Sequence, residues 1–155
     1  MKILLAVDGS PCSALAAHEV ARLPWPAGSV LKIVSAVEPF APPMSESVAL
    51  PQSYFEDIDA AFRATAREAV EGALAKLGSR KEDALKVETE ILRGPAARAI
   101  LDEAEGWGAD LLVVGSHGYG RAKRFLLGSV SQTVASHAKC SVEIVRCREA
   151  DGGDS

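Results

Sequence analysis

The stretch from Asp110 to His137, D-L-L-V-V-G-S-H-G-Y-G-R-A-K-R-F-L-L-G-S-V-S-Q-T-V-A-S-H, decides the fold. Its first apolar run, Leu111 to Val114, contains two β-branched residues and predicts a strand buried on both faces. Gly115 ends this strand, and a glycine-containing loop follows. From Gly128 onward the apolar residues recur with helical spacing. A buried strand therefore leads through a loop to a helix N-terminus, an arrangement that favours binding of an anion such as phosphate.

The residues of this loop do not complete two familiar phosphate-binding patterns. Counted from Gly115, the P-loop pattern G-x-x-x-x-G-K-[ST] has Arg121 in place of its lysine and Ala122 in place of its metal-binding hydroxyl. The dinucleotide pattern G-x-G-x-x-G, counted from Gly118, has Lys123 in place of its third glycine. The loop therefore lacks the two side chains through which a P-loop acts on a triphosphate.

The spacing that fits is G-x-x-G, nine residues, then G-[ST], formed by Gly115, Gly118, Gly128 and Ser129. This pattern resembles the ATP-binding signature of the universal stress protein family. Four further stretches resemble the family in matching order: I-L-L-A-V-D-G-S from Ile3, G-P-A from Gly94, A-D-L-L-V-V-G-S-H-G from Ala109 and H-A-K-C-S-V-E-I-V-R from His137. The resemblance predicts one universal stress protein domain over residues 1–147, followed by a disordered polar tail over residues 148–155.

Strands and helices are expected to alternate along the chain. The expected strands cover residues 2–7, 30–37, 86–92, 111–114 and 142–145, the third of them half-exposed at a sheet edge. The expected helices cover residues 10–22, 58–77 and 94–105, and a last one starts at Gly128-Ser129. This alternation predicts an α/β fold with a parallel sheet and helices on both faces. The family resemblance implies a Rossmann-like fold of the adenine nucleotide alpha hydrolase type, with five parallel strands in the order 3-2-1-4-5.

The segment 38–56 carries four of the eight prolines and little periodicity. It is therefore expected to be a long loop that acts as a lid, a binding segment or a mobile connection.

The ligand is expected where the winding of the sheet reverses, beyond the carboxyl ends of the strands. Asp8 ends the first strand and Gly115 ends the fourth, and in the implied order these strands are neighbours. Asp8 either hydrogen-bonds the nucleotide, holds a metal ion such as Mg²⁺ beside the phosphates, or only shapes the turn before the first helix. No histidine pair and no Cys–His cluster has metal-ligand spacing.

The residues predicted to contact an adenine nucleotide are Ala6, Asp8, Ala36, Val114, Gly115, His117, Gly118, Gly128, Ser129, Val130 and Ser131. The last three offer N–H groups and hydroxyls at a helix start, although Ser129 alone could simply cap that helix. Ala36 matches the family position that packs on the adenine, and in isolation it would be ordinary core. His117 either faces the phosphates or is a solvated loop residue.

Composition limits the partners of this chain. Its 155 residues suit a single domain, and a net charge of −4 with a pI near 5.4 argues against nucleic acid or an anionic membrane as a partner. The basic residues Arg121, Lys123 and Arg124 are interpreted as a solvated face. The three cysteines at positions 12, 140 and 147 form no C-x-x-C and no disulfide framework, so a cytoplasmic protein is expected.

Three functions remain open at this point. The first is a universal stress protein that binds ATP, or else ADP or AMP, as a nucleotide-dependent stress-response and signalling module with slow or no hydrolysis and no assigned catalytic residue. The second is an adenine-nucleotide-using hydrolase or adenylating enzyme, although D-G-S-P-C-S from Asp8 does not match the S-G-G-x-D-S of adenylating relatives. The third is a nucleotide-free dimeric interaction protein, against which the intact glycine pattern argues.

A homodimer is also predicted. The last strand, Val142 to Val145, is short and apolar and lies at an edge in the implied strand order. An unpaired edge can pair with the same edge of a second copy around a two-fold axis.

Overall fold

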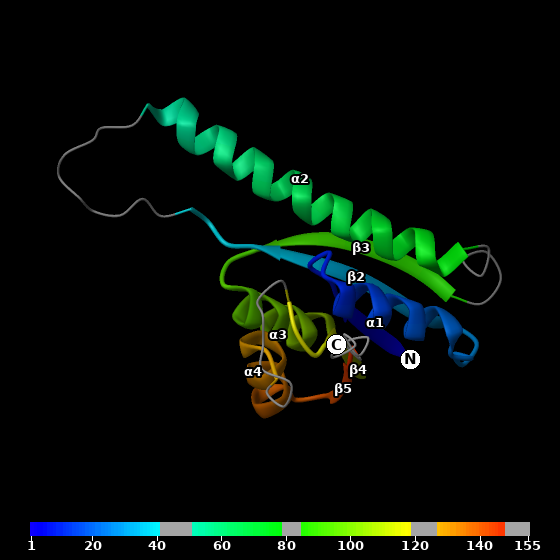
Figure 1. The fold of residues 1–155 in the computed structure, drawn as a ribbon. Helices are drawn as coiled ribbons and strands as arrows, with labels where there is room; N and C mark the ends of the chain where they lie inside the picture. Colours follow the sequence, from blue (N-terminus) through cyan, green and yellow to red (C-terminus); the bar gives the residue numbers. More distant parts are fainter. Residues whose placement is uncertain (41–50, 79–84, 119–126, 148–155) are drawn as a thin grey trace, which may run out of the picture.

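The structure, a computed structural model, describes residues 1–40, 51–78, 85–118 and 127–147 (Figure 1). Its strands are β1 (Lys2–Ala6), β2 (Ser29–Val37), β3 (Leu85–Arg93), β4 (Leu111–Gly115) and β5 (Ser141–Val145). Its helices are α1 (Pro11–Arg22), α2 (Gln52–Leu77), α3 (Ala96–Trp107) and α4 (Ser129–His137). The predicted alternation of strands and helices is confirmed over this part of the chain. The predicted tail, residues 148–155, lies outside the described residues.

The sheet is parallel, with the order β3-β2-β1-β4-β5. The expected order is therefore confirmed, with β3 at one edge and β5 at the other. β1 lies in the centre, where Ala6 is level with Val34 of β2 on one side and with Val114 of β4 on the other. The carboxyl ends of β1 and β4 consequently meet at the point where the winding reverses, which is where a ligand is expected.

Two separate apolar clusters cover the two faces of the sheet. α1 and α2 cover one face, where Val20 and Val70 pack against alternate residues of the strands such as Leu5. α3 and α4 cover the other face, where Ile100 and Val134 pack against the residues between them. Figure 1 shows α2 lying along β3 and β2, and α3 and α4 close together on the far side from α2. This arrangement explains why the central strands read as continuous apolar runs rather than alternating ones.

α1 begins as its sequence predicts. The hydroxyl of Ser10 accepts a hydrogen bond from the N–H of Ser13 at 3.3 Å, and Pro11 occupies the first helical position, where no N–H is needed.

α2 begins earlier than expected, at Gln52 rather than near Ile58. The predicted loop over residues 38–56 is therefore wrong for its last five residues, while residues 41–50 lie outside the described part. In Figure 1 the first turns of α2 extend beyond the sheet, and the buried residues of the helix begin only at Ala66. The first turns thus have no core-facing stripe that periodicity could detect. Phe55 in these turns stacks with Phe40, with 6.0 Å between the ring centroids.

A disulfide joins Cys12 in the first turn of α1 to Cys147 beyond the end of β5. The sequence predicted no disulfide framework and did not identify this single pair, whereas Cys140 is free. The two residues are 135 positions apart in the sequence, but their Cα atoms lie 5.1 Å apart. The fold brings the end of β5 beside the start of α1, a proximity that cysteine spacing cannot reveal.

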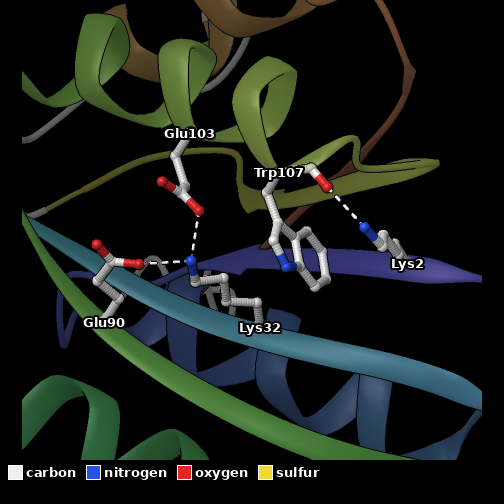
Figure 2. Close-up of polar contacts among 5 residues, drawn as sticks. All are labelled: Lys2, Lys32, Glu90, Glu103 and Trp107. Carbon is white, nitrogen blue, oxygen red and sulfur yellow. Dashed lines mark hydrogen bonds and ion pairs between the residues drawn. The ribbon is translucent and has the colours of Figure 1, made fainter.

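α3 is fastened to the sheet by a charged cluster, shown in Figure 2. The Lys32 ammonium on β2 forms ion pairs with Glu90 on β3 and with Glu103 on α3. Next to it, the Lys2 ammonium donates to the carbonyl of Trp107 at 2.9 Å and lies 5.2 Å from the centre of its ring. Burial lowers the pKa of Lys32, but hydrogen bonds and charge attraction from Glu103 and Glu90 outweigh burial and raise that pKa above its usual value.

Candidate functional site

A cavity of about 630 Å³ opens at the carboxyl ends of the central strands. All eleven residues predicted to contact a ligand line it, although they come from β1, β2, β4, α4 and the connections between them. Five further lining residues were not predicted: Val7, Ser13, Ala96, Ile100 and Leu127. The structure therefore brings the whole predicted set to one place and adds lining residues from α1 and α3.

Asp8 stands where the end of β1 enters the cavity. Its Oδ1 accepts a hydrogen bond from the N–H of Ser10 at 2.9 Å, so the carboxylate does shape the turn before α1. Its Oδ2 lies beside Gly118, where an added Cβ would stand 2.7 Å from that oxygen. Gly118 thus leaves the room in which the exposed Asp8 carboxylate sits. One Asp8 oxygen belongs to the turn, and the other lies toward the glycine loop.

Gly115 is required by packing against α1. A Cβ there would lie 2.7 Å from the backbone carbon of Cys12 and 2.8 Å from the backbone nitrogen of Ser13. Atoms of the fixed first turn of a helix cannot give way as the end of a flexible side chain can. Gly115 lines the cavity as predicted, but what explains its lack of a side chain is this contact between β4 and α1.

Ser116, which was not predicted, connects the elements around the cavity. Its N–H donates to the carbonyl of Val145 at 2.8 Å, and its own carbonyl accepts from the N–H of Gly128 at 2.8 Å. The same carbonyl lies 2.9 Å from the Ser131 hydroxyl, and the buried Ser116 hydroxyl lies 3.1 Å from Nδ1 of His117. Ser116 thereby fixes the start of α4 against the ends of β4 and β5. The sequence signal that could have identified Ser116 is its position between Gly115, which ends a strand, and His117.

The Ser131 hydroxyl belongs mainly to this scaffold. It lies 2.9 Å from the carbonyl oxygens of both Ser116 and Gly128 and is buried. Its single proton is therefore shared between two acceptors inside the protein. What Ser131 offers to the cavity is its backbone N–H.

α4 starts at the cavity without a side-chain cap. Gly128 is the N-cap and Ser129 the first helical residue, so the competing interpretation of Ser129 as the cap is wrong. The first N–H groups of an α-helix have no acceptors within the helix. Those of Ser129, Val130 and Ser131 belong to residues that line the cavity, and they carry the positive end of the helix dipole. A Cβ on Gly128 would lie 3.3 Å from Cα of His117, so the absence of a side chain at Gly128 lets the backbone at His117 lie close to the start of α4.

The part of the lining contributed by β2 and α3, the α3 wall, is apolar. Ala36 from β2 faces the cavity together with Ala96 and Ile100 from the start of α3. Ala96 is also fixed by its N–H, which donates to Oε1 of Glu38 at 3.3 Å. Small apolar residues on two elements leave a slot that suits a flat, apolar ring. The sequence predicted a helix starting at Gly94-Pro95, but it did not predict that Ala96 and Ile100 of this helix line the cavity.

In the described part of the chain, no group of three or more His, Cys, Asp or Glu side chains comes together. Asp8 is the sole carboxylate among the described residues that line the cavity. One carboxylate fits a Mg²⁺ ion that takes its remaining ligands from phosphate and water. The basic residues predicted to form a solvated face, Arg121, Lys123 and Arg124, lie outside the described residues.

With the geometry in place, comparison with known proteins gives the family. Residues 1–146 match the model of the universal stress protein family. The chain belongs to the universal stress protein family. A universal stress protein of Thermus aquaticus is 36% identical over 144 residues, which cover 93% of this chain and 97% of the relative. YxiE of Bacillus subtilis is 31% identical over 148 residues, with 94% and 98% coverage.

Solved structures agree with this assignment. Hypothetical protein MJ0577 superposes with a TM-score of 0.77 at 21% identity, covering 96% of this chain and 97% of that one, and it supports the fold. A universal stress protein in complex with cAMP has a TM-score of 0.63 at 27% identity, with 94% and 97% coverage. The universal stress protein of Archaeoglobus fulgidus in complex with dAMP has a TM-score of 0.59 at 27% identity, also with 94% and 97% coverage.

Among the helices that the structure describes, none is both long enough and apolar enough to cross a bilayer.

Proposed function

We propose that this universal stress protein binds an adenine nucleotide, with ATP as the expected ligand and ADP or AMP as the alternatives, and that the bound state acts as a stress-response signal. The observation that carries the proposal is one cavity with two unlike walls. The same cavity is lined by the apolar side chains of Ala36, Ala96 and Ile100 and by the uncapped N-terminus of α4. A nucleotide has the same division into a flat ring and an anionic tail. Two relatives at 27% identity are complexes with cAMP and dAMP, which supports the ligand class.

The two walls suggest the orientation of the nucleotide. The adenine would lie against Ala36 and the start of α3, and the phosphates would accept hydrogen bonds from the backbone N–H groups at the start of α4. The Oδ2 atom of Asp8, which lies beside Gly118, would accept a hydrogen bond from a ribose hydroxyl. Gly118 would let the backbone approach the phosphates closely, since it carries no side chain.

Slow or absent hydrolysis is part of the proposal. Fast phosphoryl transfer needs a positioned metal, charge stabilisation at the γ-phosphate and an oriented nucleophile. Within the described lining, Asp8 is the single candidate to hold Mg²⁺, and one of its oxygens accepts from Ser10. A bound Mg²⁺ would supply charge neutralisation. The Ser116 hydroxyl lies 3.1 Å from Nδ1 of His117, and this contact helps to position the ring.

The direct test of binding is calorimetric titration of the purified, nucleotide-free protein with ATP, ADP, AMP and, for comparison, GTP. We expect saturable binding of the adenine nucleotides and weaker binding of GTP, because the apolar wall offers a small slot rather than partners for the guanine amino and carbonyl groups. Mass spectrometry of the ligand that co-purifies gives an independent result. Absence of binding by every nucleotide would favour the nucleotide-free interaction protein instead.

We also propose a homodimer through β5. This strand is the edge of the sheet next to β4, and its Val142 and Ile144, which pack against the cluster under α3 and α4, are only partly buried. β3 at the other edge instead carries charged side chains such as Lys86 and Glu88, which discourage pairing. Sedimentation should show a dimer, and Ile144→Lys should shift it toward monomer while Lys86→Ala does not. A sedimenting monomer at tens of micromolar, roughly the range of weak interfaces, would contradict the proposal.

A further inference from the structure

The Cys12–Cys147 disulfide lies directly behind the candidate nucleotide cavity. Cys12 is the second residue of α1, and its neighbour Ser13 lines the cavity. Cys147 follows β5, whose last residue Val145 accepts the N–H of Ser116 at 2.8 Å. The bond therefore ties the start of the first helix to the end of the last strand, and both elements contribute to the scaffold of the site.

Two contacts connect this disulfide to the residues that hold α4. The backbone of Cys12 is packed so closely on Gly115 that an added Cβ would lie 2.7 Å from it. The Sγ atom of Cys12 lies 3.8 Å from the Ser116 hydroxyl. The carbonyl of the same Ser116 holds both Gly128 and Ser131 at the start of α4. Movement at Cys12 or at the end of β5 must therefore shift the N–H groups that the phosphates would use.

We propose that the Cys12–Cys147 pair is a reversible redox switch of nucleotide affinity, in which the disulfide form binds more tightly than the dithiol form. The inference rests on the proposed function of the cavity. When the bond is broken, two sulfur atoms that were covalently joined must separate to non-bonded contact. Cys12 is 6% exposed and wedged against Gly115, so the movement falls on Cys147 and the end of β5. Loss of this restraint loosens Ser116 and, with it, the start of α4.

The chemistry is thiol–disulfide exchange with a small cellular thiol such as glutathione. Its thiolate attacks Sγ of Cys147, which is the more accessible sulfur, and forms a mixed disulfide while Cys12 leaves as a thiolate. The helix N-terminus stabilises the negative charge on the leaving sulfur until it takes up a proton. A second thiol then attacks the mixed disulfide and releases Cys147. Two small thiols are oxidised to one small disulfide, and two electrons reduce the protein disulfide to two thiols.

The experiment measures ATP affinity by calorimetry in the oxidised protein and again after reduction with dithiothreitol. Alkylation and peptide mass spectrometry establish the state of each cysteine in both samples. We expect reduction to weaken binding by about fivefold or more, the lower end of usual coupling between sites. Cys147→Ser should bind like the reduced protein in either buffer. Cys140→Ser, which removes the free cysteine, should keep the full response to dithiothreitol.

The outcomes separate this inference from the proposed function. Equal ATP affinity in the oxidised and reduced proteins would overturn the redox switch and leave nucleotide binding intact. Direct alkylation of both Cys12 and Cys147 in protein treated with oxidised glutathione would also overturn it. Absence of ATP binding in both forms would overturn the proposed function itself, and the switch would fall with it.

Discussion

The two walls of the cavity are held in place by different physical means. The α4 wall depends on close backbone contacts and neutral hydrogen bonds, with Gly115 against Cys12 and Ser116 against Gly128. The α3 wall depends on ion pairs around Lys32 and on the packing of Ile100 into the core. Contacts of the first kind tolerate almost no added volume, whereas ion pairs respond to charge and pH. The comparison predicts which perturbations will damage each wall.

The largest effect is expected from one methyl group at the α4 wall. Gly115→Ala should lower the free energy of unfolding by about 3 kcal/mol, the upper range for overpacking a close contact, because its Cβ would meet the backbone of Cys12 and Ser13. Urea unfolding measures the change. The matched control is Gly106→Ala in α3, where an added Cβ meets nothing within 4 Å and should raise helix stability slightly. Equal stabilities of the two variants would show that the contact at Gly115 is not tight.

Removing the Lys32 charge beside the α3 wall should lower the free energy of unfolding by less than Gly115→Ala does. Lys32→Met should cost about 2 kcal/mol, typical of lost hydrogen bonds to charged groups, because the Lys32 side chain is 12% exposed and that of Glu103 20% exposed. Lys86→Met is the control, since Lys86 is 72% exposed in its pair with Glu88. It should cost less than about 0.5 kcal/mol. Urea unfolding of both variants makes the comparison, and similar losses would contradict it.

The pH dependence of the Lys32 contribution has a definite sign. The pKa of Lys32 is raised above 10.5 in the folded protein, so folding favours the protonated ammonium. The stabilising contribution is therefore complete below pH 10.5 and is lost as the pH rises through the folded-state pKa. The difference in unfolding free energy between wild type and Lys32→Met should stay constant from neutral pH to about pH 9. A difference that shrinks already in that range would contradict the assignment.

A smaller effect, on binding rather than stability, is expected at the loop. Gly118→Val should weaken ATP binding about tenfold, equivalent to 1.4 kcal/mol, because its side chain would displace the Asp8 carboxylate and occupy the approach to the phosphates. Stability should change little, since Gly118 is exposed and meets only the end of the Asp8 side chain. Calorimetry with ATP gives the affinity, and Gly106→Ala again serves as control. Unchanged ATP affinity in a folded Gly118→Val variant would contradict the proposal that the phosphates bind at this loop.

The smallest expected effect is the rate at which the protein hydrolyses bound ATP. Single-turnover hydrolysis with Mg²⁺ at saturating protein should be far slower than about 1 per second, the lower range for kinases, since Asp8 is the one acid among the described lining residues. Quantifying ADP over time measures the rate. A rate of that order that disappears in Asp8→Ala would show that the two walls form an enzyme and not a static binding site.

Much of the candidate site could be predicted because its signals are local. The glycine spacing from Gly115 to Gly128, the acidic end of β1 and the alternation of elements are each contained in a short stretch. The strand order came from family resemblance, and it is this order that brings Asp8 and Gly118 together. The residues that were missed, Ser116 among them, are defined by what they contact across the fold. In the sequence, a buried serine such as Ser116 cannot be distinguished from an exposed serine in a loop.

By itself, the sequence determined the α/β alternation, the buried central strands and eleven of the residues that meet at the cavity, since strand periodicity and glycine spacing are local consequences of backbone geometry. The tertiary structure decided the rest. It showed that Gly115 is needed for α1, that Gly128 rather than Ser129 caps α4, that Ala96 and Ile100 also line the cavity, and that Cys12 reaches Cys147. Each of these depends on which strand ends and helix starts lie side by side, and packing sets such distances across more than a hundred residues of chain.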